Sequence, residues 1–349
     1  MSGNEGDGLG RLLSDEPPGE PSAGPRRAAK RKVRKWLALL LVLLLTMVVG
    51  VGFYVIQALL AVTSIERDES LLPSYEGQPV DTETVGAPMN FVLMGSDSRG
   101  QDRGRSDSLM IAHITGDRSK VYLVSFPRDM YVEIPGHGKN KINAAYSFGG
   151  VPLAVRTLES LTDVRMHHVV VTDFEGFIGL TEELDGVTVF NESASSVPAL
   201  GYNYPRGEIT IKGDEALIYV RDRYNVAGGD LGRAARQRAV VKAIAVKLMK
   251  PSVMANPVTF SKVAGKIGQY FTVDGKLTID KMFELATSLK LTGAADIITL
   301  QAPLAGFANN SSGAVDLVNF KQLAEMSEAM KTDTMSDYWA KHKNEQFNR

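Results

Sequence analysis

Two aspartates near residue 100 are the side chains in this sequence best suited to holding a metal ion at a phosphate. Asp97 lies in GSDSRG (95–100) and Asp107 in GRSDS (104–108), directly after an apolar run that is typical of a strand. In α/β proteins, ligand-binding loops follow the ends of strands. Two carboxylates are typical of Mg²⁺, which keeps several waters and takes its other oxygens from a substrate phosphate. The alternative is a solvated turn that binds nothing.

A second group of charged residues contains many arginines. It comprises YVRDRY (219–224) and GGDLGRAARQR (228–238), and residues 221–238 hold five arginines and two aspartates. If a helix begins near Asp230, then Asp230, Arg233 and Gln237 share one face. Arginine binds phosphate through a planar fork of donors, and a helix N-terminus favours anions. These features indicate a phosphorylated ligand, or else a helix with surface ion pairs.

Two shorter motifs, VSFPRD (124–129) and KINAAY (141–146), present Arg128 and Lys141, which by themselves could be ordinary surface residues. Other chemistry lacks its motifs. The chain has no P-loop, G-x-S-x-G or S-x-x-K pattern, and its five histidines have no metal-binding spacing. It also has no cysteine, which excludes disulfides, zinc–thiolate sites and thiol nucleophiles.

Short apolar runs bounded by turn residues predict buried strands after residue 89. They lie at 91–94, 109–114, 121–125, 168–172, 187–190 and 297–300, and Thr115-Gly116-Asp117 predicts a hairpin between the second and third. Helical spacing occurs at about 149–162, 173–184, 230–250, 278–290 and 316–331. This order predicts an α/β domain with α/β/α layers around a central mixed sheet, over residues 89–349.

The N-terminal part differs in composition. Residues 1–35 are rich in Gly and Pro and end in a basic cluster, which predicts a disordered tail. Residues 36–57 contain an uncharged run, Trp36 to Ile56, long enough to cross a bilayer. The positive-inside rule predicts a single-pass protein of the cell membrane with a cytoplasmic N-terminus, a polar stalk at 58–88 and an extracellular domain. The net charge of −1 argues against a nucleic-acid binder.

Together these blocks resemble the LytR–CpsA–Psr family of bacterial cell-envelope proteins. The resemblance covers about residues 89–305 and rests on G-x-D-x-R, R-S-D, S-x-P-R-D, K-I-N-x-A-Y, R-x-R-Y and G-D-x-G-R-x-x-R-Q in that order. It implies metal-binding aspartates at Asp97 and Asp107. It implies catalytic arginines at Arg105, Arg128, Arg221, Arg223 and Arg233, and pyrophosphate- or substrate-binding residues at Arg99, Lys141, Asp230 and Gln237.

The resemblance further implies a Mg²⁺-dependent phosphotransferase that moves a glycopolymer from an undecaprenyl-pyrophosphate carrier to peptidoglycan. The polymer, whether teichoic acid, capsule or arabinogalactan, is left open, and Asp129 or Asp230 could be the general base. Segments 151–161 and 174–184 could line a slot for the lipid tail or belong to the core. Two alternatives use the same site: a polyprenyl-pyrophosphate hydrolase, and a non-catalytic sensor that binds an envelope lipid.

Overall fold

The computed structural model describes residues 65–80, 86–96, 106–254 and 256–345. The chain divides into two compact units, 1–53 and 54–349, and every described residue belongs to the second. The predicted tail and the predicted membrane helix at 36–57 therefore lie outside the described residues. Within the described part of the chain, no helix combines the length and the apolar character needed to cross a membrane.

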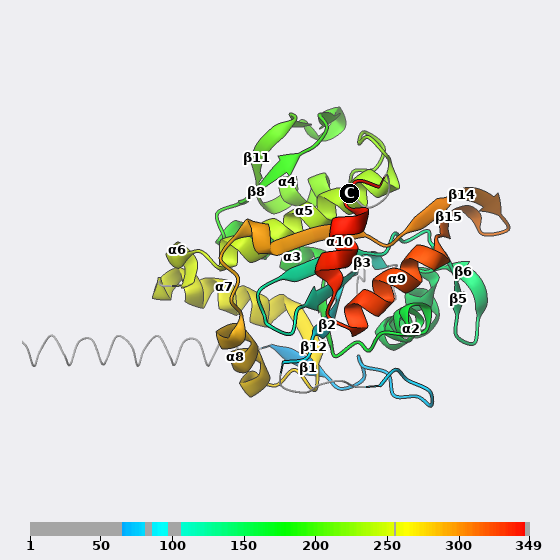
Figure 1. Cartoon of the computed structure of the whole chain (residues 1–349). Coiled ribbons are helices and arrows are strands. Elements are labelled where there is room, and N and C mark those ends of the chain that lie inside the picture. Colours follow the sequence, from blue (N-terminus) through cyan, green and yellow to red (C-terminus); the bar gives the residue numbers. More distant parts are fainter. Residues whose placement is uncertain (1–64, 81–85, 97–105, 255, 346–349) are drawn as a thin grey trace, which may run out of the picture. The chain divides into compact units, whose positions relative to one another are not determined.

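The core of the domain is a seven-stranded mixed sheet (Figure 1). Its order is β1 (Glu66–Asp68), β12 (Phe271–Asp274), β7 (His168–Thr172), β2 (Met89–Ser96), β3 (Ser106–Ile114), β4 (Val121–Ser125) and β13 (Ile297–Gln301). Strands β2, β3 and β4 form an antiparallel meander, whereas β7 and β13 run parallel to β2 and β4. The predicted central mixed sheet is confirmed, and so is the hairpin at 115–117, where Thr115 N donates to Lys120 O (3.1 Å).

Side chains alternate between the two faces of the sheet, and each face is covered by helices. Val92, Ile111 and Val124 pack with α2 (Ala144–Thr162), α9 (Phe320–Lys331) and α10 (Met335–His342). Their neighbours Phe91, Ala112 and Leu123 belong to the opposite cluster, with α5 (Asp230–Leu248) and α8 (Ile279–Ser288). A period of two places successive strand residues on opposite faces. The domain is therefore layered α/β/α, as the sequence predicts.

The remaining helices and strands lie outside the central sheet. They are β5 (Tyr131–Ile134), β6 (Gly138–Lys141), α3 (Phe174–Glu183), β8 (Val187–Asn191), β9 (Ser195–Val197), η1 (Pro198–Leu200), β10 (Tyr202–Tyr204), β11 (Gly207–Ile211), α4 (Gly213–Arg221), α6 (Pro251–Met254), α7 (Pro257–Tyr270), η2 (Ala294–Asp296), β14 (Leu304–Asn310) and β15 (Gly313–Val318). Helices α3, α4, α5 and α7 share a separate apolar cluster with β8 and β11.

Two predicted elements differ from the structure. The run 187–190 is a strand, but it lies outside the central sheet and pairs with β11, with alternating buried and exposed residues. The helix predicted from 316 begins only at Phe320, because residues 313–318 pair with β14 instead. Asn319 then caps α9 by accepting a hydrogen bond from Gln322 N (3.2 Å). Part of the segment predicted as a stalk also contributes to the domain, since residues 66–68 form β1.

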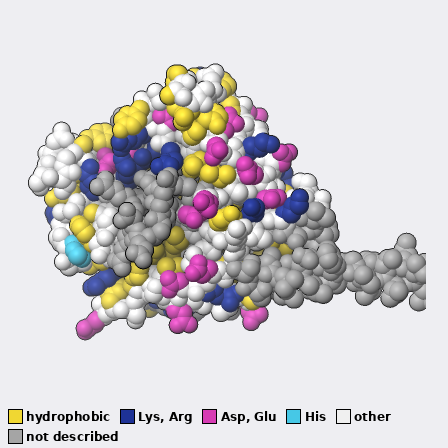
Figure 2. All heavy atoms as spheres, turned by 180° about the vertical axis from the view of Figure 1, so that it is seen from behind, with side chains coloured by type: hydrophobic (Ala, Val, Ile, Leu, Met, Phe, Trp, Pro, Cys, Tyr) yellow, Lys and Arg dark blue, Asp and Glu magenta, His cyan; other side chains and the backbone are white. Residues whose placement is uncertain are grey.

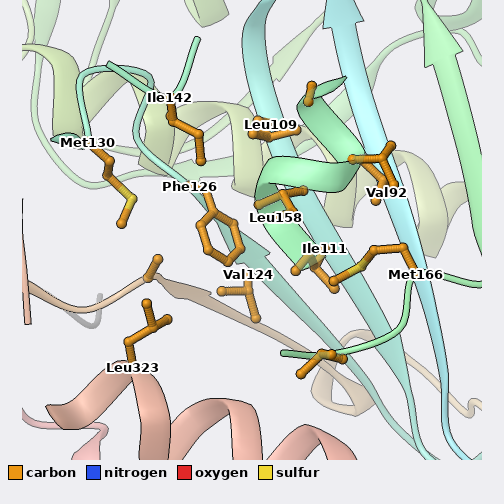
Figure 3. Packing of buried hydrophobic residues seen from close by; sticks show 14 of the residues in the cluster. Val92, Leu109, Ile111, Val124, Phe126, Met130, Ile142, Leu158, Met166 and Leu323 are labelled. Atoms are coloured by element: carbon orange, nitrogen blue, oxygen red, sulfur yellow. The ribbon is translucent and has the colours of Figure 1, made fainter. Parts of the chain in front are cut away.

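Packing at the end of β4 holds the loop that carries the first site residue. Phe126 follows β4 directly and is 2% exposed, and its ring lies among Val124, Met130 and Leu158 (Figure 3). Met130 N donates to Pro127 O (3.0 Å), which closes the turn. Because both apolar ends of this loop are buried, the intervening Arg128 is held in a fixed position.

Candidate functional site

A cavity of about 1120 Å³ opens between the end of the sheet and helices α3, α4 and α5. Much of its wall is apolar, formed by Leu93, Val170, Phe177, Leu180, Leu217, Val220, Val241, Ile244 and Phe271. Of the two segments considered as walls for a lipid tail, 174–184 contributes Phe177 and Leu180. Segment 151–161 instead belongs to the core under the sheet, with Val155 and Leu158 fully buried.

The predicted basic residues lie together in this cavity. Its lining includes Arg128, Lys141, Arg221, Arg223, Arg233 and Gln237, together with Asp129. These residues come from the loop after β4, the end of β6, the end of α4 and the first turns of α5. The structure therefore brings six predicted site residues from four separate segments to one cavity. Figure 2 shows the face opposite to that of Figure 1, on which the largest group of Lys and Arg side chains lies beside apolar ones.

Two carboxylates pair with three of these cations, Arg128, Lys141 and Arg233. Asp230 Oδ1 lies 2.7 Å from Arg233 Nη2 and 3.2 Å from Arg128 Nε. Asp129 Oδ1 lies 2.8 Å from Lys141 Nζ. The side chains of all five are between 7% and 23% exposed, so the pairs are shielded from bulk water and the charges interact more strongly than at the surface. Asp230 thus links α5 to the loop after β4.

The start of α5 forms as the sequence predicts. The helix begins at Asp230, and Gly229 occupies the N-cap position with φ +57°. A side chain at Gly232 would be blocked, because a Cβ there would lie 2.1 Å from Ala227 O. Asp230, Arg233 and Gln237 share one face: the first two form an ion pair, and the last two line the cavity.

Asp222, between two arginines that line the cavity, contacts both the following turn and Arg236. Asp222 Oδ1 accepts hydrogen bonds from the backbone N–H groups of Tyr224 (3.2 Å) and Asn225 (3.1 Å). Its Oδ2 lies 3.8 Å from Nη1 of Arg236, and both side chains are 5% exposed.

Arg236 is itself held on several sides. Its guanidinium lies 4.2 Å from the centroid of the Tyr219 ring, and Nη2 donates to Ser195 Oγ (2.5 Å). Burial lowers the pKa of Arg236, while the neighbouring tyrosines and Asp222 act in the opposite direction. Arg236 therefore joins α5 to α4 and β9, and it is not part of the cavity wall.

Sequence reasoning missed one carboxylate near the site, Asp316 of β15. Its backbone N donates to Asp129 O (2.9 Å), and it is 8% exposed. Burial raises its pKa to about 6, and the charges of Asp129 and Asp230 act in the same direction. No motif surrounds Asp316 in the sequence, and only the pairing of β15 with the loop at 129–130 brings it here. The only available signal would have been an isolated aspartate within an apolar run.

The other four predicted site residues, Asp97, Arg99, Arg105 and Asp107, come from one segment, 97–107. Asp97, Arg99 and Arg105 lie outside the described residues. Asp107 lies on β3, where its side chain is likewise outside the description, but the next residue, Ser108, lines the cavity. Among the described residues, no three His, Asp or Glu side chains are grouped so that they could hold a metal ion.

Comparison with known proteins identifies the family of the chain. The LytR_cpsA_psr family profile matches residues 56–332, which include the sheet and every cavity segment described above. The chain belongs to the LytR_cpsA_psr family. This confirms the resemblance seen in the sequence motifs.

Several named proteins are similar to this chain in sequence or fold. "Polyisoprenyl-teichoic acid–peptidoglycan teichoic acid transferase TagU" of Bacillus mycoides is 32% identical over 266 residues, covering 75% of this chain and 84% of its own length. The protein of the same name from Oceanobacillus iheyensis is 33% identical over 286 residues, with 77% and 84% covered. The solved structure "TagT bound to LIIa-WTA" superposes with a TM-score of 0.59 at 27% identity, covering 76% of this chain and 99% of that one.

Proposed function

We propose that this protein is a phosphotransferase that moves a glycopolymer from an undecaprenyl-pyrophosphate carrier to peptidoglycan. One observation carries the proposal: cations from four segments converge at a cavity whose other walls are apolar. The cations would bind the pyrophosphate, and the apolar walls would contact the polyprenyl tail. The names of the relatives, which are transferases of polyisoprenyl-linked teichoic acid to peptidoglycan, point to the same class of reaction.

The side chains that line the cavity suit the electrostatic demands of phosphoryl transfer. Arg128, Arg221, Arg223 and Arg233 would contact the pyrophosphate oxygens together with Lys141 and Gln237. Preorganised cations stabilise charge that develops in the transition state without reorganising at the moment of reaction. The carboxylate of Asp230 keeps two of these arginines in position, at 2.7 Å and 3.2 Å.

The step itself is a displacement at phosphorus. An acceptor hydroxyl oxygen forms a bond to the phosphorus that carries the glycopolymer, and the bond from this phosphorus to the bridging oxygen breaks. Polyprenyl phosphate leaves with the electron pair, and the hydroxyl proton passes to a carboxylate. Asp129 and Asp230 are the candidates for this base, because both belong to the same cluster of charged residues.

Magnesium is part of the proposal through Asp97 and Asp107. Two carboxylates and a substrate phosphate form a donor set of the kind that Mg²⁺ uses, and Ser108 beside Asp107 lines the cavity. When bound, the ion would neutralise charge on the pyrophosphate. The described residues contain no competing group of metal ligands.

The substrate also accounts for the topology that the sequence predicts. A lipid-linked donor requires a domain close to the membrane surface, which the apolar run at 36–56 and the basic cluster before it would provide. The N-terminus would then be cytoplasmic, and the domain extracellular, where peptidoglycan is assembled.

Replacing Arg221 by Ala in the full-length protein tests the function. With a lipid-linked glycopolymer, Mg²⁺ and a peptidoglycan acceptor, we expect transfer to fall by about 10²–10³-fold, as for the loss of one preorganised donor. Arg206→Ala is the matched control, since Arg206 is exposed and is not part of the cavity wall. Equal activity of the two variants would refute the assignment. Omitting the acceptor separates transfer from hydrolysis, because only a hydrolase would still release polyprenyl phosphate.

A further inference from the structure

One part of the cavity wall is neither cationic nor apolar. On one side it consists of Asn140, Asn143, Ser147 and Phe148, around the start of α2, and on the other of Ser311 and Ser312, in the turn between β14 and β15. Both sides adjoin charged residues of the site: Lys141 follows Asn140 in the chain, and the backbone N of Asp316, on the strand that follows Ser311 and Ser312, donates to Asp129 O. The cavity therefore has a third zone, made of amides, hydroxyls and one aromatic ring.

Asn143 stands in the N-cap position of α2, where asparagine usually accepts a hydrogen bond from the first turn. Here its side chain makes no such bond and lines the cavity instead. Its backbone N–H donates to Arg128 O (3.2 Å), which ties it to the site loop. Asn143 therefore lines the cavity, and its side-chain amide does not cap its own helix.

Phe148 is an exposed aromatic ring that a break in the helix presents. The backbone leaves helical geometry at the next two residues, with Gly150 at φ +67°. Its ring is 43% exposed and stacks on His137, with centroids 4.7 Å apart and an interplanar angle of 16°. Leaving such a ring in water is unfavourable, and here one of its sides is already fixed by stacking.

We propose that this zone, formed by Asn140, Asn143, Ser147, Phe148, Ser311 and Ser312, is a saccharide-binding subsite. A sugar ring presents hydroxyls, which need amide and hydroxyl partners, and an apolar C–H face, which packs on an aromatic ring. The inference rests on the proposed function, because the reaction brings two saccharides to the pyrophosphate: the first sugar of the donor and the glycan of the acceptor. A site built to hydrogen-bond hydroxyls discriminates strongly against ligands that lack them.

Two variants test the subsite. Phe148→Leu removes the aromatic face but keeps an apolar side chain, and Asn143→Ala removes the amide. Phe190→Leu is the matched control, because Phe190 of β8 is 53% exposed and is not part of the cavity wall. Since Asn143 does not cap α2, we expect its variant to unfold at the same temperature as the parent, so that a change in binding does not reflect a damaged fold.

Three probes are titrated against the full-length protein in detergent. They are a GlcNAc–MurNAc tetrasaccharide without stem peptides, a short-chain polyprenyl pyrophosphoryl-N-acetylglucosamine, and the same polyprenyl pyrophosphate without sugar. We expect Phe148→Leu and Asn143→Ala each to weaken binding of a saccharide probe by about fivefold, the loss typical of one hydrogen bond or ring contact. Binding of the sugarless lipid should not change.

A loss confined to the tetrasaccharide assigns the subsite to the acceptor, and a loss confined to the sugar-linked lipid assigns it to the donor. Either result supports the inference. It is overturned if both saccharide probes bind the two variants as well as they bind Phe190→Leu, or if the sugarless lipid weakens equally. Failure of the parent protein to bind the sugarless lipid would instead count against the proposed function, because that probe tests only the phosphate and tail sites.

Discussion

Removing the Asp222 carboxylate should loosen the segment that carries Arg221 and Arg223. Asp222 Oδ1 accepts two backbone hydrogen bonds at 3.1–3.2 Å, and loss of such a capping interaction costs about 1 kcal/mol. Asp222→Ala also leaves Arg236, which is 5% exposed, without its carboxylate. The pair is long, at 3.8 Å, and Arg236 keeps Ser195 and Asn191, so we assign this loss about 2 kcal/mol.

We therefore expect Asp222→Ala to lower the free energy of unfolding by about 3 kcal/mol. Asp222→Asn keeps the acceptor for the backbone and loses only the charge, so about 2 kcal/mol is expected. Urea unfolding gives both values, with Asp214→Ala as the control, because Asp214 is an exposed aspartate in the first turn of α4. At temperatures where all variants stay folded, transfer by the alanine variant should fall at least tenfold, since misplaced catalytic groups lose rate steeply.

The reasoning fails if Asp222→Ala unfolds within about 0.5 kcal/mol of Asp214→Ala, the range of ordinary surface substitutions. It also fails if Asp222→Asn is as unstable as Asp222→Ala, because the backbone hydrogen bonds would then contribute nothing separate from the charge.

Two further predictions concern the buried carboxylate and the apolar wall. Because the pKa of Asp316 is raised to about 6 from near 3.8, its ionised form is disfavoured in the fold, and it lowers stability increasingly as the pH rises from 4 to 6. Asp316→Asn should therefore be more stable than the parent at pH 7.5 and no more stable at pH 3.5 by urea unfolding; a difference that does not depend on pH would contradict this. Val241→Phe should fill the apolar part of the cavity, weakening polyprenyl phosphate binding at least tenfold in calorimetric titration while inorganic pyrophosphate still binds. Unchanged lipid affinity would place the tail elsewhere.

Local sequence patterns correctly predicted elements that depend on contacts between residues close together in the sequence. The turn at 115–117 and the start of α5 at Asp230 both depend on nearby glycines and aspartates, and both formed where predicted. The pattern was less informative for residues 316–331, because β15 (GAVDLV) is an apolar run with one aspartate that leads directly into the helical spacing. Whether such a stretch forms a strand depends on a distant partner, here β14.

The site residues divide in the same way. The resemblance to the family already indicated Arg128, Lys141, Arg221 and Arg233, because their motifs occur in the family's order. Phe148 and Ser311 belonged to no motif, and the only signal for Asp316 was its isolated position within an apolar run.

By itself, the sequence indicated the class of chemistry, and it determined the mixed α/β pattern and the start of α5, which a local glycine defines. Only the tertiary structure decided which segments meet. Helix α3 lines the cavity, whereas most of α2 packs in the core. Strand β15 brings Asp316 to Asp129, and Asn143 lines the cavity without capping its own helix. The physical reason is that side-chain type and short-range spacing are properties of residues close together in the chain. Proximity between distant segments arises from packing against both faces of one sheet, which no single segment encodes.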